Sequence, residues 1–197
     1  MGALGGMLVA WGHPAGWALA VLGLPAAAFC FYFFRDPERP LPADRGFVYS
    51  PGDGRVLTVA REGPGDVVTV RIFLSVFDVH VQRIPCSGVV EQALYQPGAF
   101  KMAMVEEARQ NERTIVTIAV AGRKERVVVE QIAGYVARRI RCWLQPGQAV
   151  TAGERYGMIQ FGSQAAVHLP ASAEAVVKPG DRVVGGVTPL ARWRSPA

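Results

Sequence analysis

The chain has 197 residues, and half of them are hydrophobic, which provides enough apolar side chains for one folded domain and a small appendage. Its 22 glycines and 14 prolines favour turns and short strands and argue against a helical bundle. The formal net charge is +5, but no run of five basic residues occurs, so we expect no nucleic-acid partner. With three histidines and three widely spaced cysteines, we expect no metal site.

The first predicted element is hydrophobic and covers residues 1–34, where no charged side chain occurs. The stretch from Gly16 to Phe34 is close to the length of about 20 apolar residues that crosses a bilayer core. Trp17 and the aromatic run that ends at Phe34 resemble two interfacial aromatic belts. We therefore expect an N-terminal membrane helix that anchors the chain. Pro25 would kink such a helix, so a re-entrant helical pair and a buried core helix remain alternatives.

A charged, proline-rich linker follows over residues 35–46 and cannot continue a helix. Arg35, Arg39 and Arg45 follow the apolar segment, whereas no basic residue precedes it. The positive-inside rule then predicts a protein of the inner cell membrane whose next domain faces the cytoplasm. The lack of a basic region before the apolar stretch also argues against a cleaved signal peptide.

Residues 47–197 are predicted to form a β domain. Alternating or apolar runs of strand length predict six strands, at Arg55–Ala60, Val67–Phe73, Val79–Arg83, Val89–Tyr95, Arg113–Val120 and Arg126–Ile132. Turn sequences rich in glycine, proline and aspartate separate them. We expect Lys101–Asn111 to form a helix or a mobile loop, and Gly134–Ile140 to form a short helical turn.

Two segments near the C-terminus share the pattern Pro-Gly-x-x-Val-x-x-Gly, at residues 146–153 and 179–186. Each copy predicts a tight turn that leads into a short strand and a second turn. The pair resembles the hairpins of lipoyl- and biotinyl-type sandwiches. We therefore predict a mainly β fold, a compact β-barrel or sandwich with a lipoyl-like hairpin pair, together with the N-terminal helix and short helices.

The chemistry of the chain points to Gly162 and Ser163. A serine hydroxyl can attack the carbonyl of the preceding residue, and glycine leaves that carbonyl sterically open. The pair alone is weak evidence, but Asp53 lies in a glycine-flanked turn, and His80 lies in a predicted strand two residues after Asp78. An acid that orients an imidazole, and an imidazole that takes the proton, is the arrangement that activates a hydroxyl.

Six sequence blocks follow one another from about Phe33 to Pro170. They are Phe34-Arg-Asp-Pro-Glu-Arg39, Ser50-Pro-Gly-Asp-Gly54, Asp78-Val-His-Val-Gln-Arg83, Pro97-Gly-x-Phe100 with Asn111-Glu-Arg113, Gln131-Ile-Ala-Gly-x-Val-Ala-Arg-Arg-Ile140 and Phe161-Gly-Ser163. In this order and spacing they resemble the short form of the phosphatidylserine decarboxylase family. Six blocks together are much more specific than any one alone.

The resemblance implies a precursor that cuts itself. Ser163 would attack the Gly162 carbonyl to give an ester, β-elimination would leave dehydroalanine, and loss of ammonia would leave a pyruvoyl group. The products would be a β chain of residues 1–162 and an α chain of residues 163–197, held together as a heterodimer, with a higher homo-oligomer as an open alternative. Asp53, His80 and Ser163 are similar to the family's self-cleavage triad.

The resemblance also implies the activity, which is decarboxylation of phosphatidylserine to phosphatidylethanolamine and CO2. The pyruvoyl group derived from Ser163 would be the cofactor, with no metal. It would form a Schiff base with the substrate amine and accept the electrons released with CO2. The implied partners are the phospholipid substrate and the membrane.

Four residues are expected to contact the substrate, namely Asp78, Arg83, Arg138 and Arg139. Arginine suits phosphate head groups, although a solvated basic face and an Asp78–Arg83 ion pair are alternatives. The chain departs from the longer family forms, which carry a second histidine where Arg83 stands and a threonine after the serine, where Gln164 stands. His80 would then serve both self-cleavage and decarboxylation.

Three other functions remain open from the sequence. The first is a non-cleaving lipoyl-like module that binds lipid or a partner. The second is a serine hydrolase, and the third is a pyruvoyl enzyme that acts on another amine-bearing substrate. The hydrolase is disfavoured because no Gly-x-Ser-x-Gly elbow occurs. An intact chain after expression would favour the first two.

Overall fold

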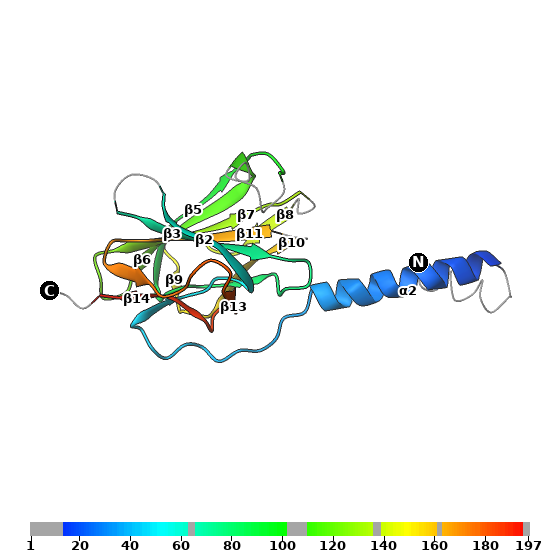
Figure 1. Ribbon diagram of the computed structural model, residues 1–197, viewed down its shortest axis with the longest axis horizontal. Helices are drawn as coiled ribbons and strands as arrows, with labels where there is room; N and C mark the ends of the chain where they lie inside the picture. Colours follow the sequence, from blue (N-terminus) through cyan, green and yellow to red (C-terminus); the bar gives the residue numbers. More distant parts are fainter. Residues whose placement is uncertain (1–13, 63–65, 102–109, 136–138, 161–162, 195–197) are drawn as a thin grey trace. The chain divides into compact units, whose positions relative to one another are not determined.

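The computed structural model describes residues 14–62, 66–101, 110–135, 139–160 and 163–194 of the chain (Figure 1). The chain divides into two compact units, Met1–Arg35 and Asp36–Ala197. The first unit contains a helix, and the second contains all of the named strands. The mainly β fold is therefore confirmed.

Helix α2 spans Pro14–Phe33 in the first unit. Proline is tolerated at a helix start, where its missing N–H needs no partner, and the alanines and leucines that follow favour a helix. Leu22, Leu24 and Phe31 expose their apolar side chains. No helix within the described residues has the length and apolar character that crossing a bilayer requires. Residues 1–13 of the predicted anchor lie outside the described part of the chain.

The second unit is built from three antiparallel sheets. The largest has the order β13-β2-β3-β11-β7-β6-β5-β9, and the smaller ones have the orders β1-β14-β12 and β4-β10-β8 (Figure 1). The strands are β1 (Phe47–Tyr49), β2 (Gly54–Arg61), β3 (Val68–Leu74), β4 (Val81–Arg83), β5 (Gly88–Gln96), β6 (Arg113–Val120), β7 (Arg126–Ile132), β8 (Arg139–Cys142), β9 (Ala149–Val150), β10 (Arg155–Gln160), β11 (Ser163–Leu169), β12 (Ala173–Ala175), β13 (Arg182–Val183) and β14 (Pro189–Trp193). Because β13 and β9 are unpaired edges of the large sheet, it forms a curled half-barrel and not the closed barrel that we considered.

The six predicted strands all occur; two of them, Arg113–Val120 and Arg126–Ile132, have the predicted bounds, and the ends of the others move by at most two residues. The largest difference is at β4, which begins at Val81, so His80 precedes the strand that was predicted to hold it. The helical turn predicted for Gly134–Ile140 is wrong at its end, where β8 begins at Arg139. Residues 102–109 of the segment Lys101–Asn111 lie outside the described part of the chain, and Gln110 has a 3-10 helical conformation.

The Pro-Gly repeats form the predicted turns and short strands. The Gly147 N–H donates to the Val90 carbonyl, and the Gly180 N–H donates to the Val56 carbonyl, both at 2.8 Å. The strands that follow, β9 and β13, lie at opposite edges of the large sheet. The second turns then meet, because a Cβ added to Gly186 would lie 3.3 Å from the Gly153 Cα. The repeats therefore border the large sheet on both sides.

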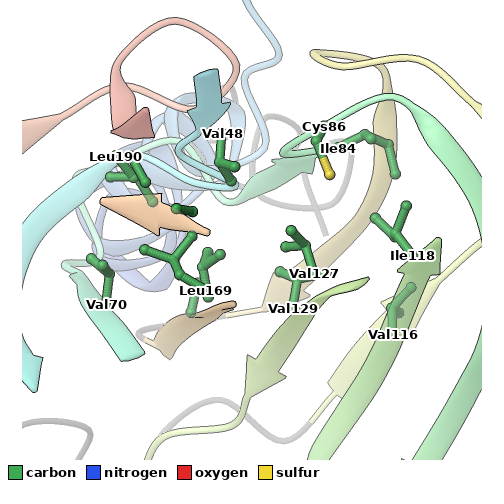
Figure 2. Close-up of a cluster of buried hydrophobic side chains, with 14 of the residues drawn as sticks. Val48, Val70, Ile84, Cys86, Val116, Ile118, Val127, Val129, Leu169 and Leu190 are labelled. Carbon is green, nitrogen blue, oxygen red and sulfur yellow. The ribbon is translucent and has the colours of Figure 1, made fainter. Parts of the chain in front are cut away.

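One face of the large sheet provides the core (Figure 2). Buried side chains from the large sheet, from the β1-β14 pair and from the segment after β4 meet there, including Val48, Val70, Ile84, Val116, Val129, Leu169 and Leu190. Burying a side chain of this size contributes about 1.5–3 kcal/mol, so this period-2 pattern decides which side chains point inward. On β11 the inward set is Ala165, Val167 and Leu169, and by the same alternation it includes Ser163.

Candidate active site

Ser163 begins β11, which lies between β3 and β7 in the middle of the large sheet. Ser163 is fully buried, and it is paired in register with Leu74 at the end of β3. The hydroxyl oxygen has no hydrogen-bond partner among the described residues. A buried hydroxyl without a partner is rare in folded proteins and calls for a chemical reason. Gly162, the predicted cleavage partner, lies outside the described residues.

His80 is brought to the same end of the domain. It follows the turn that leaves β3 after Leu74, and its carbonyl accepts a hydrogen bond from the Ile159 N–H at 3.4 Å, on the strand that leads toward Ser163. Its Nδ1 lies 3.0 Å from the Asp78 carbonyl oxygen. A carbonyl can only accept, so Nδ1 carries a proton, and the lone pair of the ring lies on Nε2 whenever the ring is neutral. When neutral, this fully buried imidazole therefore has the tautomer that a general base requires.

The Asp53 carboxylate makes a two-pronged ion pair with Arg39 of the linker. The distances from the two guanidinium nitrogens are 2.7 and 2.8 Å, and the side chains are only 10% and 15% exposed. The same carboxylate accepts a hydrogen bond from the Gly185 N–H at 2.8 Å. These contacts connect the turn around Asp53 to the linker and to the second repeat. The predicted pairing of Asp53 with His80 stays a prediction.

Asp78 and Arg83 are both buried, but they do not pair with each other as one alternative assumed. The Asp78 carboxylate accepts from Arg182 at 2.7 Å and from the Ser75 N–H at 2.9 Å. Arg83 donates to the Gly153 carbonyl at 3.0 Å and to the Pro37 carbonyl at 2.9 Å.

The surroundings of Arg83 disfavour the charged form of its guanidinium and lower its pKa. Burial lowers the pKa of the guanidinium, Arg39 and Arg155 lower it further, and Asp36 and Glu38 oppose them. This guanidinium binds the backbone of the linker, so its predicted contact with substrate stays a prediction.

Arg138 lies outside the described residues, whereas Arg139 is exposed on β8 and is paired in register with Gln160. Arg141 and Trp143 are exposed at alternate positions further along the same chain segment. Neither arginine forms an ion pair within the described part of the chain. A basic and aromatic strip, defined as Arg139, Arg141 and Trp143, therefore leads away from the end of β10.

Two groups of buried polar residues were missed by sequence reasoning. One is a pair of glutamines, Gln82 and Gln131, with amide atoms that have no partner among the described residues. Gln82 could have been noticed, because it belongs to the alternating set with Asp78 and His80. Nothing in a single sequence distinguishes a buried glutamine from an exposed one.

The other missed group lies on the face of the sheet opposite the core. Arg71 donates to Gln164 at 3.0 Å and pairs with Glu62 at 2.6 Å. Across the sheet Glu130 meets Arg113 at 3.1 Å and His168 at 3.2 Å, while His168 Nδ1 lies 2.8 Å from the Thr69 hydroxyl oxygen. His168, to which the sequence analysis assigned no role, belongs to this network. The network fixes Gln164, the residue directly after Ser163.

No group of three or more potential metal ligands gathers within the described residues.

The fold and the site together define a class of protein. It is a mainly β protein that has a buried serine without a described partner at the start of a central strand, and a buried histidine nearby. Comparison with known proteins narrows this class to one family. Residues 26–191 match the model of the phosphatidylserine decarboxylase family.

Curated relatives carry the name phosphatidylserine decarboxylase proenzyme. The protein from Symbiobacterium thermophilum is 46% identical over 182 residues, which are 89% of this chain and 84% of the relative. Those from Gluconacetobacter diazotrophicus and Solibacter usitatus are 42% and 45% identical, and cover 96% and 94% of this chain and 87% and 88% of their own lengths. The chain belongs to the phosphatidylserine decarboxylase family, as its six sequence blocks indicated.

Proposed function

We propose that the chain decarboxylates phosphatidylserine to phosphatidylethanolamine and CO2, after it has cut itself between Gly162 and Ser163. The observation that carries the proposal is Ser163, a buried hydroxyl without a described partner at the first residue of a central strand. The relatives' common name, proenzyme, supports a cut in the chain. Family membership supports the substrate.

In the proposed self-cleavage, the Ser163 hydroxyl oxygen attacks the carbonyl carbon of Gly162 while His80 takes the hydroxyl proton. The amide C–N bond breaks, an ester forms, and the Ser163 nitrogen becomes a free amine. β-Elimination then releases the Gly162 carboxylate and leaves dehydroalanine, which tautomerises to an imine. Water hydrolyses this imine to the pyruvoyl carbonyl and releases ammonia. Positioned base catalysis of this kind typically contributes about 10²–10⁴-fold in rate. Asp53 is proposed as the acidic member of the triad.

The topology supports a cut that leaves the two chains together. The proposed α chain, residues 163–197, contains β11, which pairs with β3 and β7 of the proposed β chain. It also contains β13 and β14, which pair with β2 and β1. Because these ladders and the core do not depend on the peptide bond before Ser163, we expect a stable heterodimer.

Position 163 suits a pyruvoyl group, because the site is buried and its polar atom lacks a structural role in the described fold. The group would supply an electron-accepting carbonyl next to the substrate. The chain's own residues would bind and orient the lipid head and exclude water around position 163. The neutral His80 would handle protons at its Nε2 atom.

We also propose that the protein works at the inner cell membrane with its β domain on the cytoplasmic side. The exposed apolar side chains of α2 support contact with lipid, and the basic residues that follow them support the orientation. The basic and aromatic strip on β8 supports contact with an anionic surface, where each arginine contributes about 1 kcal/mol. Arg138 and Arg139 would contact phosphate head groups there.

The activity is tested with the full chain and vesicles that contain phosphatidylserine. We expect phosphatidylethanolamine to accumulate with the wild-type protein and not with Ser163→Ala, because alanine has no hydroxyl to form the cofactor. Free serine in place of the lipid should react much more slowly. Faster reaction with serine than with the lipid would contradict the proposed substrate, and labelling of an intact chain by a fluorophosphonate would indicate a hydrolase.

A further inference from the structure

Five side chains of the β domain keep buried polar atoms without partners within the described residues, and two of them are the hydroxyls of Tyr156 and Ser172. The other three residues keep both amide atoms of Gln82, the amide oxygen of Gln131 and the hydroxyl oxygen of Ser163 without partners. All three residues are fully buried. Unsatisfied buried amides are costly, so a fold that keeps two of them beside a reactive serine has a use for them in binding or catalysis.

Gln82 and Ser163 both lie close to Leu74. Ser163 and Leu74 are paired in register on neighbouring strands, so their side chains project from the same face of the sheet. A Cβ added to Gly52 would lie 2.8 Å from the Gln82 amide nitrogen and 3.2 Å from the Leu74 Cδ2. The Gln82 amide and the Leu74 side chain therefore meet at Gly52, and the bare glycine leaves room for the amide.

Gln131 lies close to Gly157, which is the strand partner of Gln82. Gly157 is paired in register with Gln82, and a Cβ added to Gly157 would lie 2.7 Å from the Gln131 amide nitrogen. Gln131 is also paired in register with Ala165, which shares a strand face with Ser163. Strand pairing and these close approaches thus place Gln82, Gln131 and Ser163 around one buried region.

We propose that Gln82 and Gln131 bind the amino-acid head of the substrate in the mature protein, an inference that rests on the proposed function. The amide NH2 of Gln82 donates to the carboxylate of the serine head. The amide oxygen of Gln131 accepts from its amine, since the Gln131 nitrogen already donates to the Arg141 carbonyl at 3.4 Å. Together they recognise an α-amino acid by its two polar groups.

A neutral amide suits a carboxylate that must leave as CO2. A cation would stabilise the charged carboxylate in the ground state, and that stabilisation would be lost as the charge moves away, which raises the barrier. The nearest arginine on the strand, Arg83, is committed to the Gly153 and Pro37 carbonyls. The strand therefore offers the substrate a donor that orients the carboxylate without neutralising it.

The two roles are separated by comparing phosphatidylserine with phosphatidylethanolamine, which keeps the amine and lacks the carboxylate. We expect Gln82→Met to raise the KM for phosphatidylserine at least about tenfold while inhibition by phosphatidylethanolamine stays unchanged. Gln131→Met should weaken both to a similar degree. Both variants should melt at or above the wild-type temperature, because methionine removes an unsatisfied polar group. Gln92→Met, at an exposed position of β5, is the control and should change neither constant.

Intact mass is measured on every variant before kinetics. If the wild-type chain is cut and the Gln82→Met chain is not, the inference is overturned, because the Gln82 amide would then serve self-cleavage. Equal loss of phosphatidylserine and phosphatidylethanolamine affinity in Gln82→Met, or no loss of either, would also overturn it. Gln82→Asn, which keeps an amide, should recover part of the lost affinity for phosphatidylserine. An uncut, inactive wild type would instead refute the proposed function itself.

Discussion

At the scale of single residues, the site is built by backbone groups that fix polar side chains. The Asp78 carbonyl sets the tautomer of His80, and the Gly185 N–H and Arg39 hold Asp53. Arg71 holds Gln164 next to Ser163, the proposed nucleophile. The surroundings of the proposed site are thus arranged in the chain itself.

Asp53 and Arg39 can be separated by a matched pair of variants. We predict that Asp53→Asn slows self-cleavage at least about 100-fold, because the negative charge that would favour a protonated His80 is lost. Arg39→Gln keeps that charge and should slow cleavage less than tenfold. Both rates are read from the time course of the two chains by intact mass. Equal slowing would show that Asp53 acts only through its ion pair with the linker.

The roles of Ser163, His80 and Asp53 are predictions from the sequence, which rest on the residue types and their order. Gln82 and Gln131 could not be predicted as a pair, because their meeting depends on the register of β4 with β10 and of β7 with β11. The partner of Asp78 was missed for the same reason, since Arg182 comes from a distant segment. Long-range register is the information that a single sequence lacks.

At the scale of elements, β3, β11 and β7 carry a buried charged network on the face opposite the core. Burial would raise the pKa of Glu130, but the hydrogen bond from His168 and the charges of His168, Arg113 and Arg71 hold it below its ordinary value. A carboxylate with a lowered pKa stabilises the fold only while it is ionised. The strands are therefore joined by charge as well as by their backbone ladders.

Removing the Glu130 carboxylate should destabilise the protein. We predict that Glu130→Ala lowers the free energy of unfolding by about 3 kcal/mol at pH 7, because Arg113 is left buried without its counter-charge. The pH dependence follows from the lowered pKa. The contribution is complete above the ordinary glutamate value of about 4.3 and is lost as pH falls through the folded-state value.

Urea unfolding at several pH values checks this prediction. The difference between wild type and Glu130→Ala should shrink toward acid pH. Glu91→Ala is the control, because Glu91 pairs with Arg126 at the surface and should matter little. A stability difference that grows as the pH falls below 4.3 would contradict the assignment.

The period-2 pattern predicted the strands because half-buried strands must alternate. It placed the start of β4 two residues too early, since buried residues continue through the turn before the strand. It missed β8, where arginines alternate with Ile140 and Cys142 on an edge strand. Strand β11 was also not assigned in advance, because its run of small side chains lacks a marked alternation.

At the scale of the whole molecule, the proposed cut falls between β10 and β11, so it leaves every strand intact. The strands after the cut are interleaved with those before it in two sheets. A new chain end at position 163 would therefore be held in place by β3 and β7 and by the packed core. This arrangement allows a covalent rearrangement at one residue without loss of the fold.

The central claim is that Ser163 is converted during self-cleavage, and intact mass of the purified full chain tests it most directly. We predict two chains, residues 1–162 and 163–197, with the smaller at roughly 3.5 kDa and about 17 Da lighter than the same peptide with an N-terminal serine. Ser163→Ala should give one uncut chain. A single uncut chain from folded, active wild-type protein would contradict the account, as would a small chain that keeps its full serine mass.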